Sequence, residues 1–226
     1  MTLKLRNTSK KIYIFGDSYA QLHQPLIEYS WPYRLYANYD VENFALEGTS
    51  VDYSLQKLYE LVSGNYNKDG VVIFFMTDIQ RQNWPFFHPQ HQYLSSRIFD
   101  NEFYEEHKVM QKHINLYKNY ADFAKTFFMQ TPHPSVDISI EKNYAFINAY
   151  STFFSKILIW PCFEKWDNKF VLNENVKVMA KPMMEIGGDD EQTDSFDRRI
   201  NHLVKREHKL VTRTLVDWIE DGHTKI

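Results

Sequence analysis

The sequence Gly16-Asp17-Ser18 stands where a short apolar run, residues 11–15, gives way to a polar turn. The run has the β-branched and aromatic character of a buried strand, and the glycine and aspartate end it. A serine at that point can attack an acyl carbon once a base removes its proton. A helix beginning just after Ser18 would direct backbone N–H groups to the same place, where they could stabilise an oxyanion. Ser18 is therefore a candidate nucleophile.

Three further segments offer the partners that a serine nucleophile needs. Gly48 follows the second predicted strand and, lacking a side chain, can present its backbone N–H to a ligand. Thr77 and Asp78 follow the third predicted strand, and His202 stands at the entry to the last predicted helix. An alcohol, an imidazole and an exposed amide are the groups of an acyl-transfer site, provided that the fold brings them together.

Five short, mostly apolar segments are predicted to be strands, at residues 11–15, 39–44, 71–76, 156–160 and 176–181. Longer periodic segments separate most of them, which predicts βα units and a mostly parallel sheet covered on both faces. The expected fold is a three-layer α/β/α sandwich with a flavodoxin-like sheet of about five strands. Such sheets bind ligands beyond the carboxyl ends of their strands, where the polar segments named above would lie.

Helices are predicted at residues 22–37, interrupted near Pro32, and at 53–62, 101–129, 138–154 and 201–219. The last helix has the clearest pattern. Basic residues lie on other faces than the apolar residues that recur at helical spacing, which are Leu203, Leu210, Val211, Leu215, Trp218 and Ile219. We expect this helix to pack against the sheet.

The connection between the third and fourth predicted strands is far longer than an ordinary βα loop. We expect an insertion there, at about residues 80–150, with helices of its own. Aromatic residues and prolines gather between Trp84 and Tyr93, a pattern typical of a binding loop or lid. These aromatic faces could stack on a sugar or pack on an acyl chain, so both substrates stay open.

Length and charge exclude several classes of function. The 226 residues are enough for one well-buried domain, and we expect a single domain over residues 1–226. The 26 basic and 29 acidic side chains give a net charge of -3, which disfavours nucleic acid as a partner. No apolar run approaches the ~20 residues of a membrane span, and no secretory signal is visible. We expect a protein without a membrane span, cytoplasmic or associated with a virion.

Metal sites and other cofactors find little support in the sequence. Carboxylates at ligand spacing are missing around the dispersed histidines, which are His88, His91, His107 and His113. The acidic residues 189–191 lack a full calcium-loop pattern and are typical of a solvated turn. Cys162 lies in an apolar run, as a buried and inert thiol does. We therefore expect a reaction without a cofactor.

With these blocks the sequence resembles the SGNH (GDSL-type) hydrolases. The family's first block is Gly-Asp-Ser, and by this resemblance Ser18 is the nucleophile and its own N–H an oxyanion donor. Residues 43–48 are similar to the second block, which makes Gly48 the second donor. A histidine, an apolar residue and a later histidine repeat the family's last block, which implies that His202 is the general base and His208 a structural residue. The match spans most of the chain.

The third and fourth blocks depart from the family pattern. The third is Gly-x-Asn-Asp in the family, and here Thr77 stands at the asparagine and Asp78 at the aspartate. A threonine hydroxyl has a shorter reach than a carboxamide, so Thr77 is a weaker oxyanion donor. The position three residues before His202 is Arg199, and the nearest carboxylate is Asp197, with Asp194 behind it. Asp197 is the expected orienting group for the imidazole.

The resemblance implies a serine hydrolase that forms an acyl-enzyme on Ser18, either an esterase or a carbohydrate O-deacetylase. The chain is similar in this respect to compact members that bacterial viruses encode. Its substrate would be a small-molecule or carbohydrate ester, and the expected substrate contacts are Asp17, Asp78, Arg81 and Trp84. The two departures leave an alternative open, in which an inactive descendant of the fold acts as a binding or virion structural protein.

Overall fold

The computed structural model describes residues 10–22, 28, 30–77, 136–163, 171–186 and 203–222. At its centre lies a five-stranded sheet with the strand order β2-β1-β3-β4-β5, in which all neighbours run parallel. The strands are β1 (Lys11–Phe15), β2 (Asp40–Asn43), β3 (Val71–Met76), β4 (Lys156–Pro161) and β5 (Val176–Val178). This is the flavodoxin-like order, so the predicted sheet is confirmed.

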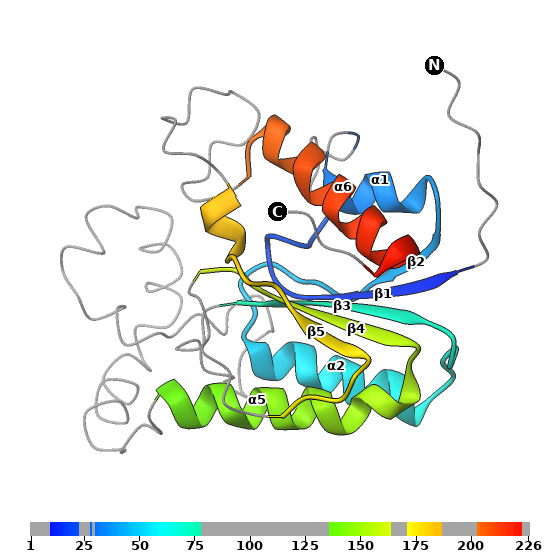
Figure 1. Ribbon diagram of the computed structural model, residues 1–226, viewed down its shortest axis with the longest axis vertical. Coiled ribbons are helices and arrows are strands. Elements are labelled where there is room, and N and C mark those ends of the chain that lie inside the picture. The colour runs from blue at the N-terminus through cyan, green and yellow to red at the C-terminus, as the bar shows by residue number, and fades with distance from the viewer. Residues whose placement is uncertain are drawn as a thin grey trace, which may run out of the picture.

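Helices cover both faces of this sheet. In the described residues they are α1 (Trp31–Tyr36), α2 (Val51–Ser63), α5 (Val136–Tyr150) and α6 (Lys205–Asp221), with short 3₁₀ helices at Ser151–Phe153 and Met183–Ile186. Helices α1 and α6 lie on one face and α2 and α5 on the other (Figure 1). The predicted three-layer sandwich is therefore confirmed.

Two hydrophobic cores fill the spaces between the layers, because successive side chains of a strand point to opposite faces. On β1, Ile12 and Ile14 belong to the core under α1 and α6, whereas Tyr13 and Phe15 belong to the core under α2 and α5. All six residues of β3 are buried, as expected for a central strand of a parallel sheet.

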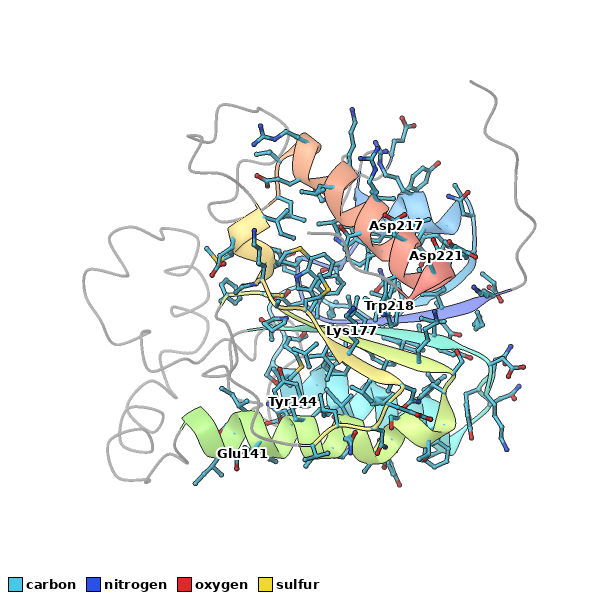
Figure 2. The ribbon with its side chains drawn as sticks, viewed as in Figure 1. Glu141, Tyr144, Lys177, Asp217, Trp218 and Asp221 are labelled. Atoms are coloured by element: carbon cyan, nitrogen blue, oxygen red, sulfur yellow. The ribbon has the colours of Figure 1, made fainter. Side chains whose placement is uncertain are left out.

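Helix α6 packs against the sheet as its apolar spacing predicts. Leu215 and Trp218 are buried against the sheet, whereas Leu210 is 37% exposed and lies outside the buried stripe. Trp218 points toward the strands and Asp217 away from them (Figure 2). The Glu207 carboxylate accepts a hydrogen bond from the N–H of Val204 at 2.7 Å, which caps the start of the helix.

Helix α5 shows the same division on the opposite face of the sheet. Tyr144 is fully buried and points toward the sheet, while Glu141 is exposed (Figure 2). The helix lies at the end of the expected insertion, and the predicted helix at 101–129 lies outside the described residues. None of the helices within the described ranges combines the length and the apolar character needed to cross a bilayer.

Pro32 begins a helix instead of interrupting one. It occupies the first turn of α1, where a missing N–H costs nothing because that group has no partner within the helix. The described part of the expected helix at 22–37 is accordingly short. Residues 23–27 and 29 of that expected helix lie outside the described residues.

Candidate active site

The turn that carries Ser18 begins at Gly16, directly after β1. Gly16 has a φ of 152°, and a Cβ atom at this position would lie 2.8 Å from the Cβ of Phe75 on β3. Since Cβ atoms do not approach each other so closely, glycine alone lets the chain leave β1 beside β3. The sequence signal that ended the predicted strand thus has a steric cause.

A tight turn, and not a helix, follows Ser18 in the described residues. The N–H groups of Ala20 and Gln21 both donate to the carbonyl oxygen of Asp17 at 3.0 Å. The carbonyl of Ala20 accepts a hydrogen bond from the Asn43 side chain at 2.8 Å. Because a side chain at the end of strand β2 binds this carbonyl, the turn is held in place, and the expectation of a helix starting just after Ser18 is wrong for residues 18–22.

The side chain of Asp17 holds this turn from the inside. One carboxylate oxygen accepts the N–H of Tyr19 at 3.1 Å and the other accepts the hydroxyl of Thr77 at 2.5 Å. Asp17 is fully buried. A contact between Asp17 and a substrate, which the sequence analysis predicted, would require the turn to open.

The hydrogen bond from Thr77 to Asp17 joins the ends of two neighbouring strands, since Thr77 directly follows β3. Strand β1 has β2 on one side and β3 on the other, so the strand order reverses here and the sheet has its topological switch point. Open α/β sheets bind their ligands at such points. A hydroxyl carries one hydrogen, and that of Thr77 points to Asp17. Donation from Thr77 to an oxyanion stays a prediction.

Ser18 is buried in this turn but is slightly more exposed than the residues on either side of it. It keeps 9% of its surface exposed, whereas Asp17 keeps 0% and Tyr19 keeps 4%. Its position follows from the hydrogen bonds on both sides of it, because the backbone on either flank is fixed by Asp17. A serine whose backbone is held this way presents its hydroxyl at a fixed place, which is the preorganisation that nucleophilic catalysis requires.

The loop after β2 lies against the same turn. The N–H of Leu46 donates to the carbonyl of Gly16 at 3.1 Å, and the N–H of Glu47 donates to the Gln21 side chain at 2.5 Å. The two acceptors, Gly16 and Gln21, lie on either side of Ser18 in the chain. Gly48 follows at once, buried and with a φ of 73°, a left-handed conformation that favours glycine. The structure thus brings the loops of Ser18 and Gly48 together, as the sequence predicts.

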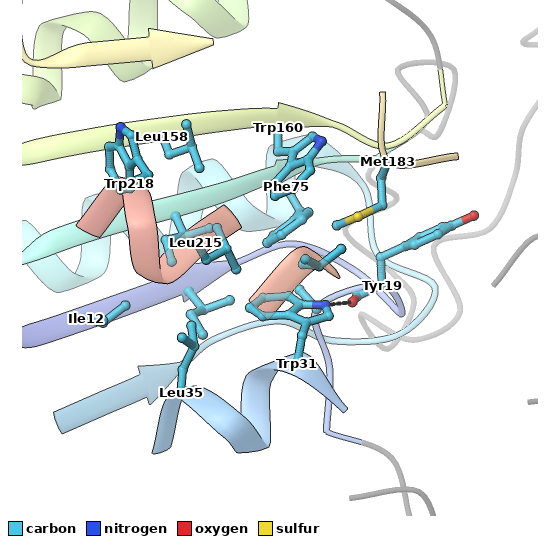
Figure 3. Packing of buried hydrophobic residues seen from close by; sticks show 14 of the residues in the cluster. Ile12, Tyr19, Trp31, Leu35, Phe75, Leu158, Trp160, Met183, Leu215 and Trp218 are labelled. Atoms are coloured by element: carbon cyan, nitrogen blue, oxygen red, sulfur yellow. Dashed lines mark hydrogen bonds between the residues drawn. The ribbon is translucent and has the colours of Figure 1, made fainter. Parts of the chain in front are cut away.

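Trp31 connects the Ser18 turn to helix α6. Its indole N–H donates to the carbonyl of Tyr19 at 2.9 Å (Figure 3). Its backbone N–H donates to Nδ1 of His208 at 3.3 Å. The ring is fully buried and packs on Phe75, with ring centroids 4.7 Å apart. His208 therefore has a structural contact, in keeping with the structural role expected for it.

The neighbours of Ser18 and His202 belong to one hydrophobic core. Tyr19, next to Ser18, and Leu203, next to His202, are both 4% exposed and both lie in the cluster under α1 and α6. His202 itself lies outside the described residues, as do Asp78, Arg81, Trp84 and Asp197. Their predicted roles stay predictions.

Sequence reasoning assigned no role to Asn43 or Trp31. Asn43 receives the N–H of Ala45 at 2.8 Å and donates to the Ser18 turn, so it ties the two loops together. A polar residue ending an otherwise regular strand was its signal in the sequence. Trp31 stands before Pro32, a typical helix start, but nothing in its local sequence indicates the distant partners of its two N–H groups.

Cys162 is buried, as expected. In the part of the chain that the structure describes, no three side chains of His, Cys, Asp or Glu gather as metal ligands would.

No family model matches this chain, and no curated protein matches it. Among solved structures, the chain is similar to a member of the lipolytic protein G-D-S-L family from Veillonella parvula DSM 2008. The two share 10% sequence identity with a TM-score of 0.48, over 94% of this chain and 100% of that one.

Proposed function

We propose that this protein is a serine hydrolase that cleaves a carboxylic ester, as an esterase or a carbohydrate O-deacetylase, through an acyl-enzyme on Ser18. The observation that carries the proposal is the rigid turn at the switch point of the sheet. There Ser18, which keeps 9% of its surface exposed, stands between a buried aspartate and a loop that contains a left-handed glycine. A mere connection between β1 and α1 would not need a buried carboxylate to fix it.

In the proposed reaction, His202 removes the hydroxyl proton of Ser18 while the serine oxygen attacks the ester carbonyl carbon. The backbone N–H groups of Ser18 and Gly48 donate to the oxyanion of the tetrahedral intermediate. The alcohol then leaves with the proton from His202, and the acyl group stays on Ser18. Water, deprotonated by the same imidazole, releases the acid and restores the serine.

The roles of the remaining residues follow from this scheme. Asp197 orients the imidazole of His202, and the hydroxyl of Thr77 can donate to the oxyanion only once it leaves Asp17. Arg81, Trp84 and Asp78 contact the substrate.

A second candidate function is favoured by one observation. The hydroxyl of Thr77 donates to Asp17. In this arrangement Thr77 does not replace the asparagine that is the third oxyanion donor of an SGNH site. Loss of one oxyanion donor costs about 2.7–4 kcal/mol of transition-state stabilisation. The alternative is an inactive member of the fold that binds a ligand at the same place or assembles into a virion.

Turnover of p-nitrophenyl acetate separates the two functions. We expect the wild-type protein to hydrolyse this ester and the Ser18→Ala variant to lose roughly 10³-fold or more in kcat. Ser63→Ala, an exposed serine at the end of α2, is the matched control and should keep the wild-type rate. Equal rates for the wild-type and Ser18→Ala proteins would favour the inactive alternative.

A further inference from the structure

A cavity of about 490 Å³ lies on the flank of the sheet, between strand β2, the loop that follows it and helix α2. Its size is within the range of small-molecule sites. Neither Ser18 nor Thr77 lines it, so it is distinct from the candidate nucleophile. It shares residues 43–46 with the loop that rests on the Ser18 turn.

The inner wall of the cavity is aromatic and aliphatic. Phe44 contributes a ring that stacks on Phe15 at 5.0 Å between centroids and is thereby fixed. Leu46 and Leu61 line the same wall, and Tyr53 adds a second, half-buried ring, one face of which lies under the Lys57 ammonium, 5.6 Å from the ring centroid. Burial raises the pKa of the Tyr53 phenol, which agrees with a ring that is sheltered from water. The wall offers flat apolar surface to a ligand.

The rim of the cavity is polar, and its charged side chains already form ion pairs. The ammonium of Lys57 pairs with Glu60 at 2.6 Å, one turn along α2. Glu42 pairs with Lys11 at 3.3 Å. A charged ligand would have to compete with these ion pairs, whereas a neutral ligand with hydroxyl groups can add hydrogen bonds to the remaining carboxylate lone pairs and to Asn65.

From this combination we infer that the cavity between β2 and α2 binds a neutral saccharide ring. The apolar C–H face of a pyranose would lie on the rings of Phe44 and Tyr53, and its hydroxyls would meet the carboxylates and the amide of the rim. An acyl chain would use the wall but leave the rim without partners. A phosphate or carboxylate ligand would lie against Glu42 and Glu60, which disfavour it.

The saccharide site has a consequence for the proposed hydrolase. Its wall includes Leu46, whose N–H holds the carbonyl of Gly16 beside the nucleophile. The loop that lines the saccharide site thus also holds the Ser18 turn. The inference that the saccharide belongs to the substrate rests on the proposed function, and it favours a carbohydrate O-deacetylase over a simple esterase.

The test measures binding without turnover. Cellobiose and N,N′-diacetylchitobiose are titrated into the Ser18→Ala protein and followed by calorimetry and by saturation-transfer NMR on the sugar protons. We expect saturable binding in the millimolar range, with saturation concentrated on the protons of one ring face. Tyr53→Ala should weaken binding about tenfold, the upper range for loss of one aromatic contact.

Further variants show whether the effect of Tyr53→Ala is specific to the cavity. Tyr59 is 54% exposed and does not line the cavity, so Tyr59→Ala should bind the sugars as the parent does. Tyr53→Phe keeps the ring and should retain binding, which guards against a folding defect in Tyr53→Ala. Asn65→Ala, a rim change at an exposed position, should weaken binding several-fold.

The possible outcomes distinguish failure of the saccharide site from failure of the proposed hydrolase. No saturable binding of either sugar, or equal weakening by Tyr53→Ala and Tyr59→Ala, overturns the saccharide site. Tighter binding of phenylacetate or phosphate than of the sugars overturns it too. Binding that follows the expected pattern in a protein without ester turnover leaves the saccharide site standing and removes the hydrolase instead.

Discussion

At the scale of single residues, Asp17 determines the geometry of the site although it is fully buried. Its carboxylate and its carbonyl together receive hydrogen bonds from Tyr19, Ala20, Gln21 and Thr77. A buried carboxylate is stable only when such donors satisfy it. Asp17 therefore fixes the backbone on both sides of the candidate nucleophile.

Thr77→Val is a nearly isosteric change that tests this support. It removes the hydrogen bond that one buried oxygen of Asp17 accepts from Thr77, so we expect a loss of about 1–3 kcal/mol in the free energy of unfolding. Urea denaturation measures the loss, and Thr77→Ser, which keeps the hydroxyl, should restore most of it. A Thr77→Val protein with wild-type stability but a kcat lowered about 10²-fold or more would instead assign the hydroxyl to the oxyanion.

Gly16→Ala should be more destabilising than its φ alone implies. The new methyl group would meet Phe75, whereas Gly222, with a φ of 73°, has nothing within 4 Å of its Cβ position. We expect Gly16→Ala to cost about 1–3 kcal/mol more than Gly222→Ala, because overpacking adds to the backbone strain. Thermal denaturation of the two variants measures the difference, and equal melting temperatures would contradict the steric account of the turn.

At the scale of elements, the site depends on the attachment of α1 and α6 to the Ser18 turn. Trp31 makes this attachment with its two N–H groups, one to Tyr19 and one to His208. Helix α6 is also held at its far end, where Lys156 donates to the carbonyls of Trp218 and Ile219 at 3.1 and 2.9 Å. A cation at a helix carboxyl end is favourable. Both ends of the helix that follows His202 are thereby fixed relative to β1 and β4.

Trp31→Phe keeps an aromatic ring in the core but removes the donor to Tyr19. We expect a fall in kcat of about tenfold with little change in KM, since the turn and the helix would lose one fixed contact while the substrate surface stays unchanged. The measurement is the kcat and KM for p-nitrophenyl acetate. Trp218→Phe, a change at the other end of the core, is the matched control, and an equal loss in both variants would assign the effect to general packing.

Helix α5 gives a prediction about pH. Burial raises the pKa of the Tyr144 phenol above its ordinary value of 10.0, so the folded protein keeps a proton that the unfolded chain loses in alkaline solution. Stability should be complete below about pH 10 and fall above it by up to about 1.4 kcal/mol for each pH unit. Tyr144→Phe should flatten this alkaline slope in urea denaturation between pH 9 and pH 11. An unchanged slope would contradict the assignment.

At the scale of the whole molecule, the sequence predicts the sheet better than the helices. Runs of apolar, β-branched and aromatic residues predict strands β1 and β3 with their observed ends, because a buried parallel strand needs apolar side chains on both faces. Helices beside polar loops are harder to predict. In place of the helix expected just after Ser18 there is a turn that accepts a hydrogen bond from Asn43, a partner on another strand.

The same limit applies to the candidate site. The local sequence is enough to predict that a turn begins at Gly16 and carries Ser18, since a strand must end at a residue that permits a turn. The bond from Thr77 to Asp17 and the contacts of Trp31 join residues far apart in the chain, and no local pattern encodes them. Contacts of this kind decide which loops meet, and they became visible only in the fold.

Covalent labelling of Ser18 tests the central claim most directly. The wild-type protein is treated with a fluorophosphonate probe, digested and examined by mass spectrometry, beside the Ser18→Ala and Ser63→Ala variants. The proposed hydrolase predicts one phosphonylated serine, at residue 18, in the wild-type and Ser63→Ala proteins and none in Ser18→Ala. Absence of the label from residue 18 in the folded wild-type protein, or equal labelling of all three proteins, would contradict the claim that Ser18 is a nucleophile.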